Sequence, residues 1–420
     1  MPEVLEELDI VALDSHGRGV AASGAIIPGA LPGEKARVRL NVPRAEEVEI
    51  LAPSAERVAP FCPWFGRCGG CAVQHMSEPA YARWKRGLIV EALNQAGVAA
   101  EVEPLVDAHG SGRRRATFHA RFPHGGADEV GFMRARSHDI VSIDGCPLFA
   151  PAMAGAVQAA RALARDLRAI MRPLDIGVVA TLEGLDVDLR GSGPLAFWET
   201  EKLIRTAEAL DLARLSNHGL TVIERRPPRV SFGGTMVSLP PGAFLQATEA
   251  GEAWLADFAE RAFEGARRVA DLFSGAGAFA LRLARRGEVL AADADEKAML
   301  ALKRAASAAE GLKPVVAETR DLFRRPLAAA ELAAFDGALF DPPRAGAEAQ
   351  VKAFAESALS LVVAISCNPA TFARDARILI DGGFAIAQVT PLDQFRHSPH
   401  VEIAAVFRRN KARGRPRRLL

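Results

Sequence analysis

The residue of this sequence with the clearest chemical potential is Cys367, which follows the apolar run V-V-A-I-S at 362–366. The run is rich in β-branched residues and predicts a buried strand, and Asn368-Pro369 is typical of a helix start. Such a strand delivers one thiol to the carboxyl edge of a sheet, where open α/β folds bind ligands. The alternative is a small buried hydrophobe, since free cysteine is among the most buried residue types.

Two carboxylates stand in comparable positions. Asp341 ends a short apolar run and precedes Pro342-Pro343-Arg344, which predicts a rigid extended rim or a plain turn. Glu402 lies inside the apolar run at 401–407, where a lone carboxylate either faces water or serves proton chemistry. A thiol and two carboxylates at one sheet edge would suit nucleophilic and general-base catalysis.

Residues 271–277 read D-L-F-S-G-A-G and predict a strand end, a glycine-rich turn and a helix start. Glycine lets a ligand approach the backbone, and a helix N-terminus offers unpaired N–H groups. With Asp293 ending the next expected strand, the pattern fits the fingerprint of a nicotinamide dehydrogenase. Asp271 before the glycines instead favours a ligand with a cationic aminoacyl group, such as S-adenosylmethionine, with Asp293 on its ribose.

Three cysteines, Cys62, Cys68 and Cys71, have the spacing C-x5-C-x2-C in a segment poor in expected secondary structure, and Cys146 is an isolated fourth candidate. Three close cysteines and a distant one are a common iron–sulfur ligand set. Structural zinc bound by the three cysteines and His75 explains the spacing equally well. A thioredoxin-type redox motif does not fit, because the segment lacks the βαβ pattern.

From about residue 231 the sequence alternates strictly between strand-like and helix-like segments. We expect parallel strands followed by two closing strands, at 268–272, 288–293, 314–317, 337–340, 361–366, 385–390 and 401–408. This predicts the α/β class, with a doubly wound Rossmann-like sheet and an antiparallel edge.

The N-terminal half has a different pattern. Short strand-like runs at 8–51, separated by glycine and proline, predict a small β-barrel of the OB type. The period of residues 78–95 predicts a helix, residues 151–171 are expected as one long helix, and strand-like runs surround a cluster of arginines at 113–115. Such a cluster is a candidate phosphate-contacting surface.

Composition places the chain among ordinary globular proteins, with 49% hydrophobic and 25% charged residues and a net charge of +1. No signal peptide or membrane span is expected, so we predict a cytoplasmic protein with no membrane partner. Residues 408–418 carry seven basic residues and no acid, which is typical of a solvated tail that meets phosphate.

Five motifs occur in order along the chain: C-x5-C-G-G-C, D-L-F-S-G-A-G, D-P-P-R-A-G, S-C-N-P-A-T and H-V-E. In this combination the sequence resembles the RNA 5-methyluridine methyltransferase family nearly end to end, and residues 17–36 resemble a TRAM domain, an RNA-binding module. The resemblance implies a TRAM-like β-barrel at 1–52, a central α+β iron–sulfur and RNA-binding domain at 53–230, and a class I methyltransferase domain at 231–420.

The resemblance also implies residue roles. Cys367 becomes the nucleophile and Glu402 the general base. The cofactor S-adenosylmethionine falls on Gln246, Phe273, Asp293, Asp321 and Asp341. The ligands of a [4Fe-4S] cluster correspond to Cys62, Cys68, Cys71 and Cys146. The resemblance thus favours an iron–sulfur cluster over structural zinc.

Four positions depart from the family pattern and put cofactor contacts in question. Ala278 replaces a usual asparagine, and Asp293 a usual glutamate. Arg396 and Ser398 stand where proline and threonine are common.

The implied activity is methylation of uracil C5 through a covalent bond between Cys367 and C6, on a base flipped out of its stack. The partner is RNA, and the barrel favours large-subunit (23S) ribosomal RNA over transfer RNA. We expect a monomer. Two alternatives stay open: an exocyclic-amine methyltransferase, suggested by D-P-P, and a non-enzymatic RNA-binding iron–sulfur protein.

Overall fold

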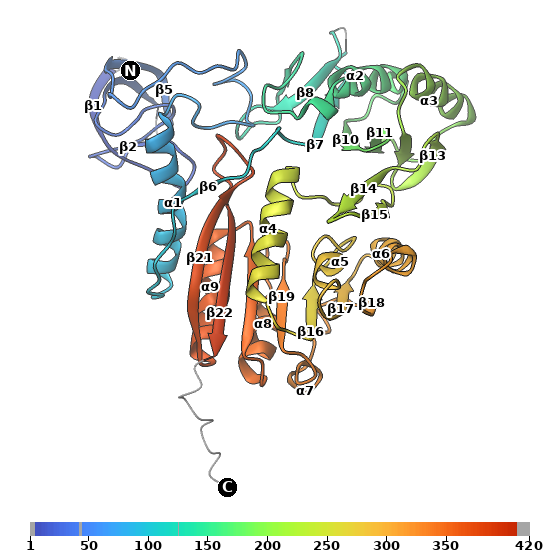
Figure 1. Ribbon diagram of the computed structural model, residues 1–420. Coiled ribbons are helices and arrows are strands. Elements are labelled where there is room, and N and C mark those ends of the chain that lie inside the picture. Colours follow the sequence, from blue (N-terminus) through green and yellow to red (C-terminus); the bar gives the residue numbers. More distant parts are fainter. Residues whose placement is uncertain (1–4, 42–43, 125, 410–420) are drawn as a thin grey trace.

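The computed structural model describes residues 5–41, 44–124 and 126–409. Their strands form four sheets, and the largest lies in the lower body of Figure 1. Its eight strands follow in the order β18 (Val315–Thr319), β17 (Glu288–Asp293), β16 (Arg268–Leu272), β19 (Gly337–Phe340), β20 (Leu361–Ser366), β22 (Glu402–Arg409), β21 (Phe384–Asp393) and β6 (Val106–Asp107).

The pairing of this sheet confirms the predicted α/β class. Strands β16 to β20 pair in parallel, and β22 enters antiparallel between β20 and β21. The order of strands along the chain therefore changes direction between β16 and β19. This is the switch point, where such sheets bind ligands at the carboxyl ends of their strands. Four of the five predicted parallel strands match residue for residue, and β18 is displaced by one to two residues.

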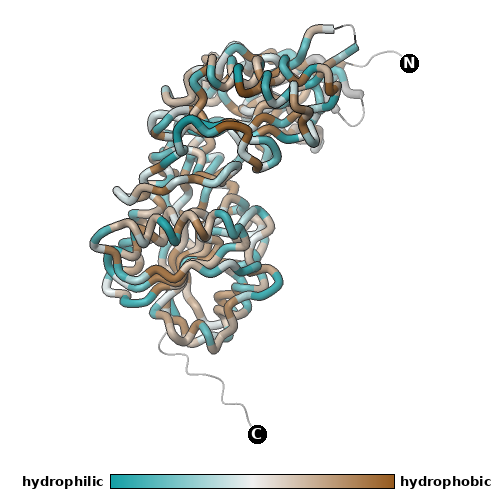
Figure 2. Tube along the Cα trace, turned by 90° about the vertical axis from the view of Figure 1, so that its right-hand side faces the viewer, coloured by the Kyte–Doolittle hydropathy of each residue, from teal (hydrophilic) through white to brown (hydrophobic). Residues whose placement is uncertain are grey.

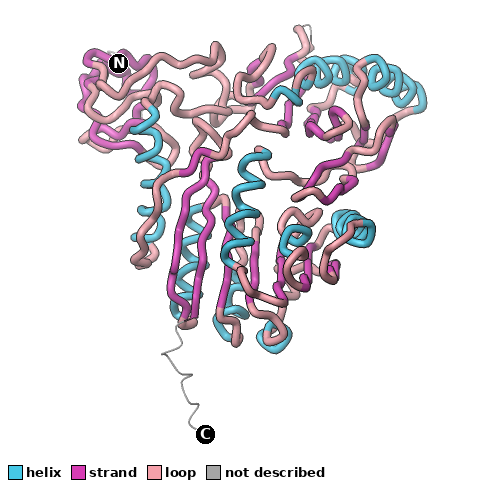
Figure 3. The backbone as a smooth tube through the Cα atoms, in the orientation of Figure 1, coloured by secondary structure: helices cyan, strands magenta, loops and turns pink. Residues whose placement is uncertain are grey.

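Two layers of helices cover the sheet, as Figure 3 shows. Alternate strand residues face opposite sides, so Val363 and Ile365 pack into one core and Val362 and Ala364 into the other. The first core is covered by α4 (Glu249–Ala262), α5 (Ala280–Leu283) and α6 (Glu296–Ala308). The second is covered by α1 (Glu78–Gln95), α7 (Ala329–Leu332), α8 (Glu348–Glu356) and α9 (Pro369–Asp381). Figure 2 shows hydrophobic segments, in brown, running through this body.

The first sheet along the chain has the order β3 (Ile26–Ile27), β2 (Gly19–Ala21), β1 (Leu5–Leu13), β4 (Lys35–Asn41) and β5 (Arg44–Ala52). It encloses a small core of its own, and β3 lies against β5, so the sheet curls toward closure. This agrees with the expected β-rich N-terminal region. Its assignment as a TRAM module stays a prediction.

The central segment builds an antiparallel-rich sheet in the order β13 (Leu220–Glu224), β12 (Arg214–Asn217), β11 (Gly184–Arg190), β10 (Leu174–Thr181), β7 (Arg115–Arg121), β8 (Glu129–Met133) and β9 (Ile140–Ser142). Helices α2 (Ala156–Asp166) and α3 (Phe197–Ala209) pack on it, and the hairpin of β14 (Arg229–Phe232) and β15 (Thr235–Ser238) follows.

The single helix expected over residues 151–171 is wrong. The segment holds a 3₁₀ turn at Pro151–Met153, then α2, then a second 3₁₀ turn at Arg168–Ile170. Gly155 and Met171 have φ of 83° and 52°, and these left-handed conformations interrupt the helix before α2 and end it after the second turn.

The N-terminal half also contributes to the large sheet. Helix α1 packs beside α9, and β6 pairs in parallel with β21 (Figure 1). The domain boundaries predicted at residues 52 and 230 stay predictions. Both α1 and β6 precede residue 230, yet they help to build the C-terminal body. No helix within the described ranges is long and apolar enough to cross a bilayer. The basic tail lies almost wholly outside these ranges.

Candidate active site

Cys367 lies at the carboxyl end of β20, the strand expected to deliver it. The next residue, Asn368, caps α9 by accepting the N–H of Ala370 at 3.0 Å, so the thiol occupies a fixed turn between strand and helix. The thiol is half-buried. Burial, followed by the Glu402 and Asp341 carboxylates, raises its pKa to about 11, while the Arg344 guanidinium lowers it.

A chain of hydrogen bonds joins the polar side chains of this edge. Gln246 donates its Nε2 to Asp341 Oδ2 at 2.9 Å and accepts Gln394 Nε2 at 2.7 Å. Gln394 Nε2 also donates to Glu402 Oε2 at 2.8 Å. We call Gln246, Asp341, Cys367, Gln394 and Glu402 the catalytic edge.

The two carboxyl groups of the catalytic edge have raised pKa values. Burial is the main cause for both, and the Asp341 carboxylate further raises the pKa of Glu402. The amides of Gln246 and Gln394 oppose these shifts, and the Arg115 guanidinium also lowers the pKa of Glu402. A buried carboxylate with a raised pKa is a competent base near neutral pH.

The start of α4 and the segment before β7 position Gln246. Thr248 caps α4 by accepting the N–H of Gly251 at 3.0 Å, and Gln246 lies just before this cap. Arg114, before β7, donates its Nε to the Gln246 carbonyl at 3.1 Å and forms a buried ion pair with Glu252. The Gln246 side chain is therefore 6% exposed and fixed at the rim of the sheet.

The glycine-rich turn follows β16 beside this edge. Gly275 and Gly277 have φ of 52° and 93°, and a Cβ on Gly277 would lie 2.4 Å from Leu302 Cδ1, so only glycine fits there. Asp293 ends β17 and accepts the Gly275 N–H at 2.9 Å, which holds the turn. The Phe273 ring lies 5.4 Å from the Phe323 ring.

Asp271 lies in β16, just before the glycine-rich turn. Its carboxyl is fully buried, and neither oxygen has a hydrogen-bond partner among the described residues. Burial and the nearby Asp341 and Asp293 carboxylates raise its pKa well above the ordinary value. Such a group favours a cationic ligand at this edge.

Asp321 is placed differently from the other predicted residues. It is exposed in the loop after β18, and its Oδ1 accepts the N–H groups of Phe323 and Arg324 at 3.0 and 3.2 Å. The structure thus gives Asp321 a turn-forming role and brings Gln246, Asp341, Cys367 and Glu402 together without it.

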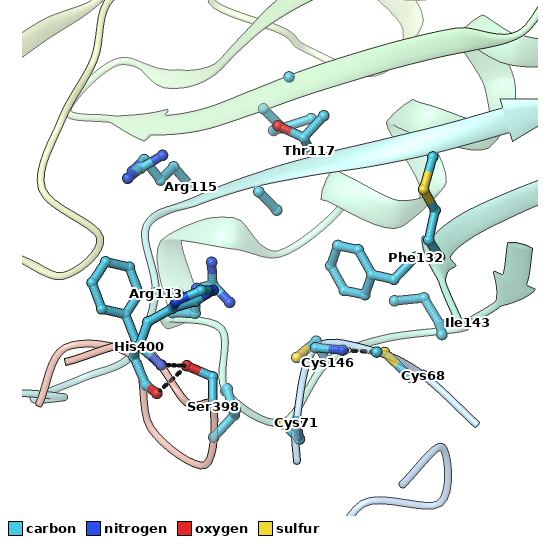
Figure 4. A pocket seen from close by; sticks show the side chains of 18 of the residues that line it. Cys68, Cys71, Arg113, Arg115, Thr117, Phe132, Ile143, Cys146, Ser398 and His400 are labelled. Atoms are coloured by element: carbon cyan, nitrogen blue, oxygen red, sulfur yellow. Dashed lines mark hydrogen bonds between the residues drawn. The ribbon is translucent and has the colours of Figure 1, made fainter. Parts of the chain in front are cut away.

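The four predicted cluster cysteines line one cavity of about 770 Å³, shared with Arg113, Arg115, Phe244, Arg344 and His400. We call the part of it around Cys62, Cys68, Cys71 and Cys146 the cysteine pocket (Figure 4). Burial, and then neighbouring thiols, raise the pKa of Cys71 to about 12, and burial raises the pKa of Cys68 and Cys146.

The cysteine pocket leaves out the histidine of the zinc alternative. His75 packs its ring 5.4 Å from Phe65 and does not line the cavity. Within the described ranges no three Cys, His, Asp or Glu side chains are placed to hold a metal ion. The cysteines are thus assembled around one space without converging on a single ion.

The cysteine segment contacts the loop of the catalytic edge directly. The N–H groups of Ala72 and Val73 donate to the His397 carbonyl at 2.7 and 3.2 Å. At the end of β21, just before this loop, Asp393 forms an ion pair with Lys85 of α1, both almost fully buried, and accepts the Tyr81 hydroxyl.

Sequence reasoning missed Gln394 and Lys85. Gln394 stands in the motif D-Q-F-R-H-S-P-H-V-E, yet an amide carries no chemical signal until its partners are known. Lys85 could have been noticed as a lysine within the apolar stripe of its helix, between Tyr81 and Ile89.

Fold and site together define a class I methyltransferase: a switch-point sheet with a glycine-rich turn, acids at the next strand ends, and a thiol beside a buried carboxylate. A family model described as tRNA (Uracil-5-)-methyltransferase matches residues 241–410. A solved Pyrococcus abyssi tRNA (uracil-54, C5)-methyltransferase has the same fold, with a TM-score of 0.72 at 23% identity, covering 96% of this chain and 100% of that one.

Two relatives extend the match over the whole chain. An uncharacterized RNA methyltransferase of Caulobacter vibrioides is 42% identical, covering 96% of this chain and 100% of the relative. A 23S rRNA (uracil(1939)-C(5))-methyltransferase, RlmD, of Chromohalobacter salexigens is 33% identical, covering 96% and 88%. The chain belongs to the RNA (uracil-5-)-methyltransferase family and is an enzyme of that class. Membership excludes the exocyclic-amine and the non-enzymatic alternatives.

Proposed function

We propose that this enzyme methylates C5 of a uridine in 23S ribosomal RNA through a covalent bond between Cys367 and C6 of the base. The observation that carries the proposal is the placement of the Cys367 thiol beside two carboxyls, the half-buried Asp341 and the buried Glu402, at the ligand edge of the sheet. The name of the Chromohalobacter relative supports ribosomal RNA as the target.

The chemistry follows from the weakness of uracil C5 as a nucleophile. The Cys367 thiol gives its proton to the Asp341–Glu402 pair, which releases it to water, and the thiolate forms a bond to C6. The electrons of the C5=C6 bond then move to C5, which takes the methyl group. Glu402 accepts the C5 proton, the double bond re-forms, and the Sγ–C6 bond breaks to return the thiolate.

S-adenosylmethionine would supply the electrophilic methyl group, and the solved Pyrococcus abyssi enzyme of the same fold contains S-adenosyl-L-homocysteine. Gln246, Phe273, Asp293 and Asp341 would hold it, with Asp293 on the ribose. The unpartnered Asp271 carboxyl fits a cofactor that carries positive charge. Asp321 would contact the cofactor only at the rim of its site, because the carboxylate of Asp321 already accepts the Phe323 N–H of its own turn.

A [4Fe-4S] cluster would be held by Cys62, Cys68, Cys71 and Cys146. Four thiols around one cavity match the donor set of a cluster, which spreads its thiolates over four irons instead of one ion. Bound there, the cluster would fix the cysteine segment, whose backbone N–H groups support the His397 carbonyl in the loop before Glu402.

RNA would enter along the shared cavity. The Nε atoms of Arg113 and Arg115 are buried without a hydrogen-bond partner among the described residues, and the Arg115 guanidinium lies 4.5 Å from the centre of the exposed Phe244 ring. Cations beside an aromatic face suit phosphate and an unstacked base. We further propose that the enzyme acts as a cytoplasmic monomer.

The experiment is deletion of the gene, followed by mapping of 5-methyluridine in ribosomal and transfer RNA. We expect one or more 5-methyluridines to disappear from 23S rRNA and to return with the wild-type gene but not with Cys367→Ala. Loss confined to transfer RNA would overturn the ribosomal target. Restoration by Cys367→Ala would overturn the covalent mechanism.

A further inference from the structure

Gln394 lies where the separate parts of the catalytic edge meet. Its side chain is fully buried in the loop between β21 and β22, and it contacts Gln246, Ala247 and Glu402. These partners come from two segments about 150 positions apart in the chain. No other side chain with a described hydrogen bond joins Glu402 to the rest of this edge.

The partners of Gln394 fix the orientation of its amide. The Ala247 N–H donates to Gln394 Oε1 at 2.9 Å, so the opposite atom must be the NH₂ group. That group donates to Gln246 Oε1 and to Glu402 Oε2. The orientation of Gln246 follows in turn, since its NH₂ group then faces Asp341. A flip of either amide would place acceptors against acceptors.

The surrounding helix leaves room for this arrangement. Gly251 of α4 faces Gln394, and a Cβ built on it would lie 3.0 Å from Gln394 Oε1 and 3.1 Å from Gln394 Cβ. A larger residue at 251 would meet Thr248 Oγ1 at 2.8 Å and press on the Gln394 side chain as well. The position of Gln394 is thus set by packing as well as by hydrogen bonds.

We infer that Gln394 is a positioning residue for the last step of the reaction, holding Glu402 by one oxygen so that the other can take the C5 proton. In the described structure Oε2 of Glu402 is bound by Gln394, and Oε1 has no hydrogen-bond partner. The inference rests on the proposed function, because it assigns Glu402 the elimination step. It adds a residue that touches neither the thiol nor the reacting carbons.

Gln394 also influences when Glu402 is ionised. The charged and titratable groups that face Glu402 are Asp341 after β19, Arg115 of β7 and Cys367 after β20. Asp341 and burial favour the neutral acid, whereas Gln394 and Arg115 favour the carboxylate. Removing the Gln394 amide therefore raises the pH at which Glu402 becomes a base.

The test uses the full-length holoenzyme with unmodified transcripts of 23S rRNA and of transfer RNA. Gln394→Met, which keeps the length of the side chain but cannot donate, should slow product release from the adduct roughly tenfold. The RNA–protein adduct should therefore accumulate on a denaturing gel. The acid limb of the pH profile of turnover should move up by about one to two pH units, because a hydrogen bond to the carboxylate has been lost.

Matched variants separate this role from a structural one. Gln388→Met removes a half-buried glutamine of β21, the strand just before Gln394. This glutamine bonds Glu103, and its loss should leave adduct level and pH profile unchanged. Gln394→Glu keeps the shape and, when ionised, sets an acceptor against Glu402, so it should accumulate adduct even where Gln394→Met folds poorly.

The outcomes distinguish the inference from the proposed function. If Glu402→Gln accumulates adduct while both Gln394 variants have the wild-type adduct level and pH profile, the inference is overturned and the function stands. A rise in KM for S-adenosylmethionine without a change in kcat would also overturn it, since Gln394 would then act only through Gln246. If Glu402→Gln forms no adduct with either transcript, the proposed function itself fails.

Discussion

At the catalytic edge the amides of Gln246 and Gln394 each pair with a carboxylate and with each other. In the cysteine pocket, 62–146, four thiols line one cavity, and Cys68 Sγ accepts the Gly70 N–H at 3.4 Å. The first arrangement is organised before any ligand binds. The second provides four thiols as metal ligands, and a bound cluster would hold them in a fixed arrangement. The two are joined at His397, so the state of one can affect the other.

The largest expected effect separates the two regions by chemistry. Cys367→Ala should reduce methyl transfer by at least roughly 10⁴-fold, because the variant has no atom to bond to C6. Iron content and unfolding free energy should stay near the wild-type values, since the half-buried thiol belongs to the edge and not to the pocket. Methyl transfer is measured with labelled cofactor and RNA, and turnover by the variant would refute the nucleophile.

The matched change in the other region is Cys71→Ala. Protein purified without oxygen should be brown, with about four irons per chain, and this variant should lose nearly all of them. Iron and sulfide analysis gives the measurement, with Cys367→Ala as the control that keeps its iron. Colourless wild-type protein containing zinc would contradict the cluster and restore the zinc alternative.

The third change acts on the connection between the regions. Lys85→Met leaves the Asp393 carboxylate buried without its cation, and we expect the free energy of unfolding to fall by about 3–5 kcal/mol. Urea denaturation measures it. Adding Asp393→Asn should recover much of the loss, because the uncompensated charge is then gone.

A surface pair provides the control for Lys85. Lys352 and Glu348 form an exposed i,i+4 ion pair, and Lys352→Met should change the free energy of unfolding far less than Lys85→Met. Equal effects of the two substitutions would mean that the buried pair does not hold the loop of the catalytic edge.

The same contrast explains how far the sequence could predict the molecule. Strands β16, β17, β19 and β20 follow from local apolar runs, and the thiol at Cys367 follows from the end of such a run. Glu402 is 3% exposed only because β22 enters the sheet between β20 and β21, a long-range pairing that its own apolar run does not reveal.

The parts that sequence reasoning missed depend on contacts between distant segments. Gln394 acquires its role from Gln246 and Ala247, and Lys85 from Asp393, 308 positions away. The cysteine spacing indicated a site but left its metal open, because spacing fixes neither the cavity nor the place of His75. Residue types at strand ends were predictable, and their mutual pairing was not.

The last prediction concerns Asp271, which has no hydrogen-bond partner among the described residues, in enzyme free of cofactor. Burial raises the pKa of Asp271 well above its ordinary 3.8, so the folded state keeps a proton that the unfolded state has lost. The stability from this group is complete below pH 3.8 and is lost as pH rises toward the folded pKa, by about 1.4 kcal/mol per pH unit. Asp271→Asn should therefore flatten the fall of unfolding free energy as pH rises above about 3.8. The cysteine pocket adds nothing in this acidic range, because cysteine thiols ordinarily titrate near 9.0 and burial raises the pKa of Cys68, Cys71 and Cys146 further. Urea titrations at several pH values measure the slopes, and equal slopes for the wild type and Asp271→Asn would show that Asp271 is ionised in the folded protein. That result would mean that a buried negative charge lies beside the catalytic edge and that a bound cationic ligand would have to neutralise it.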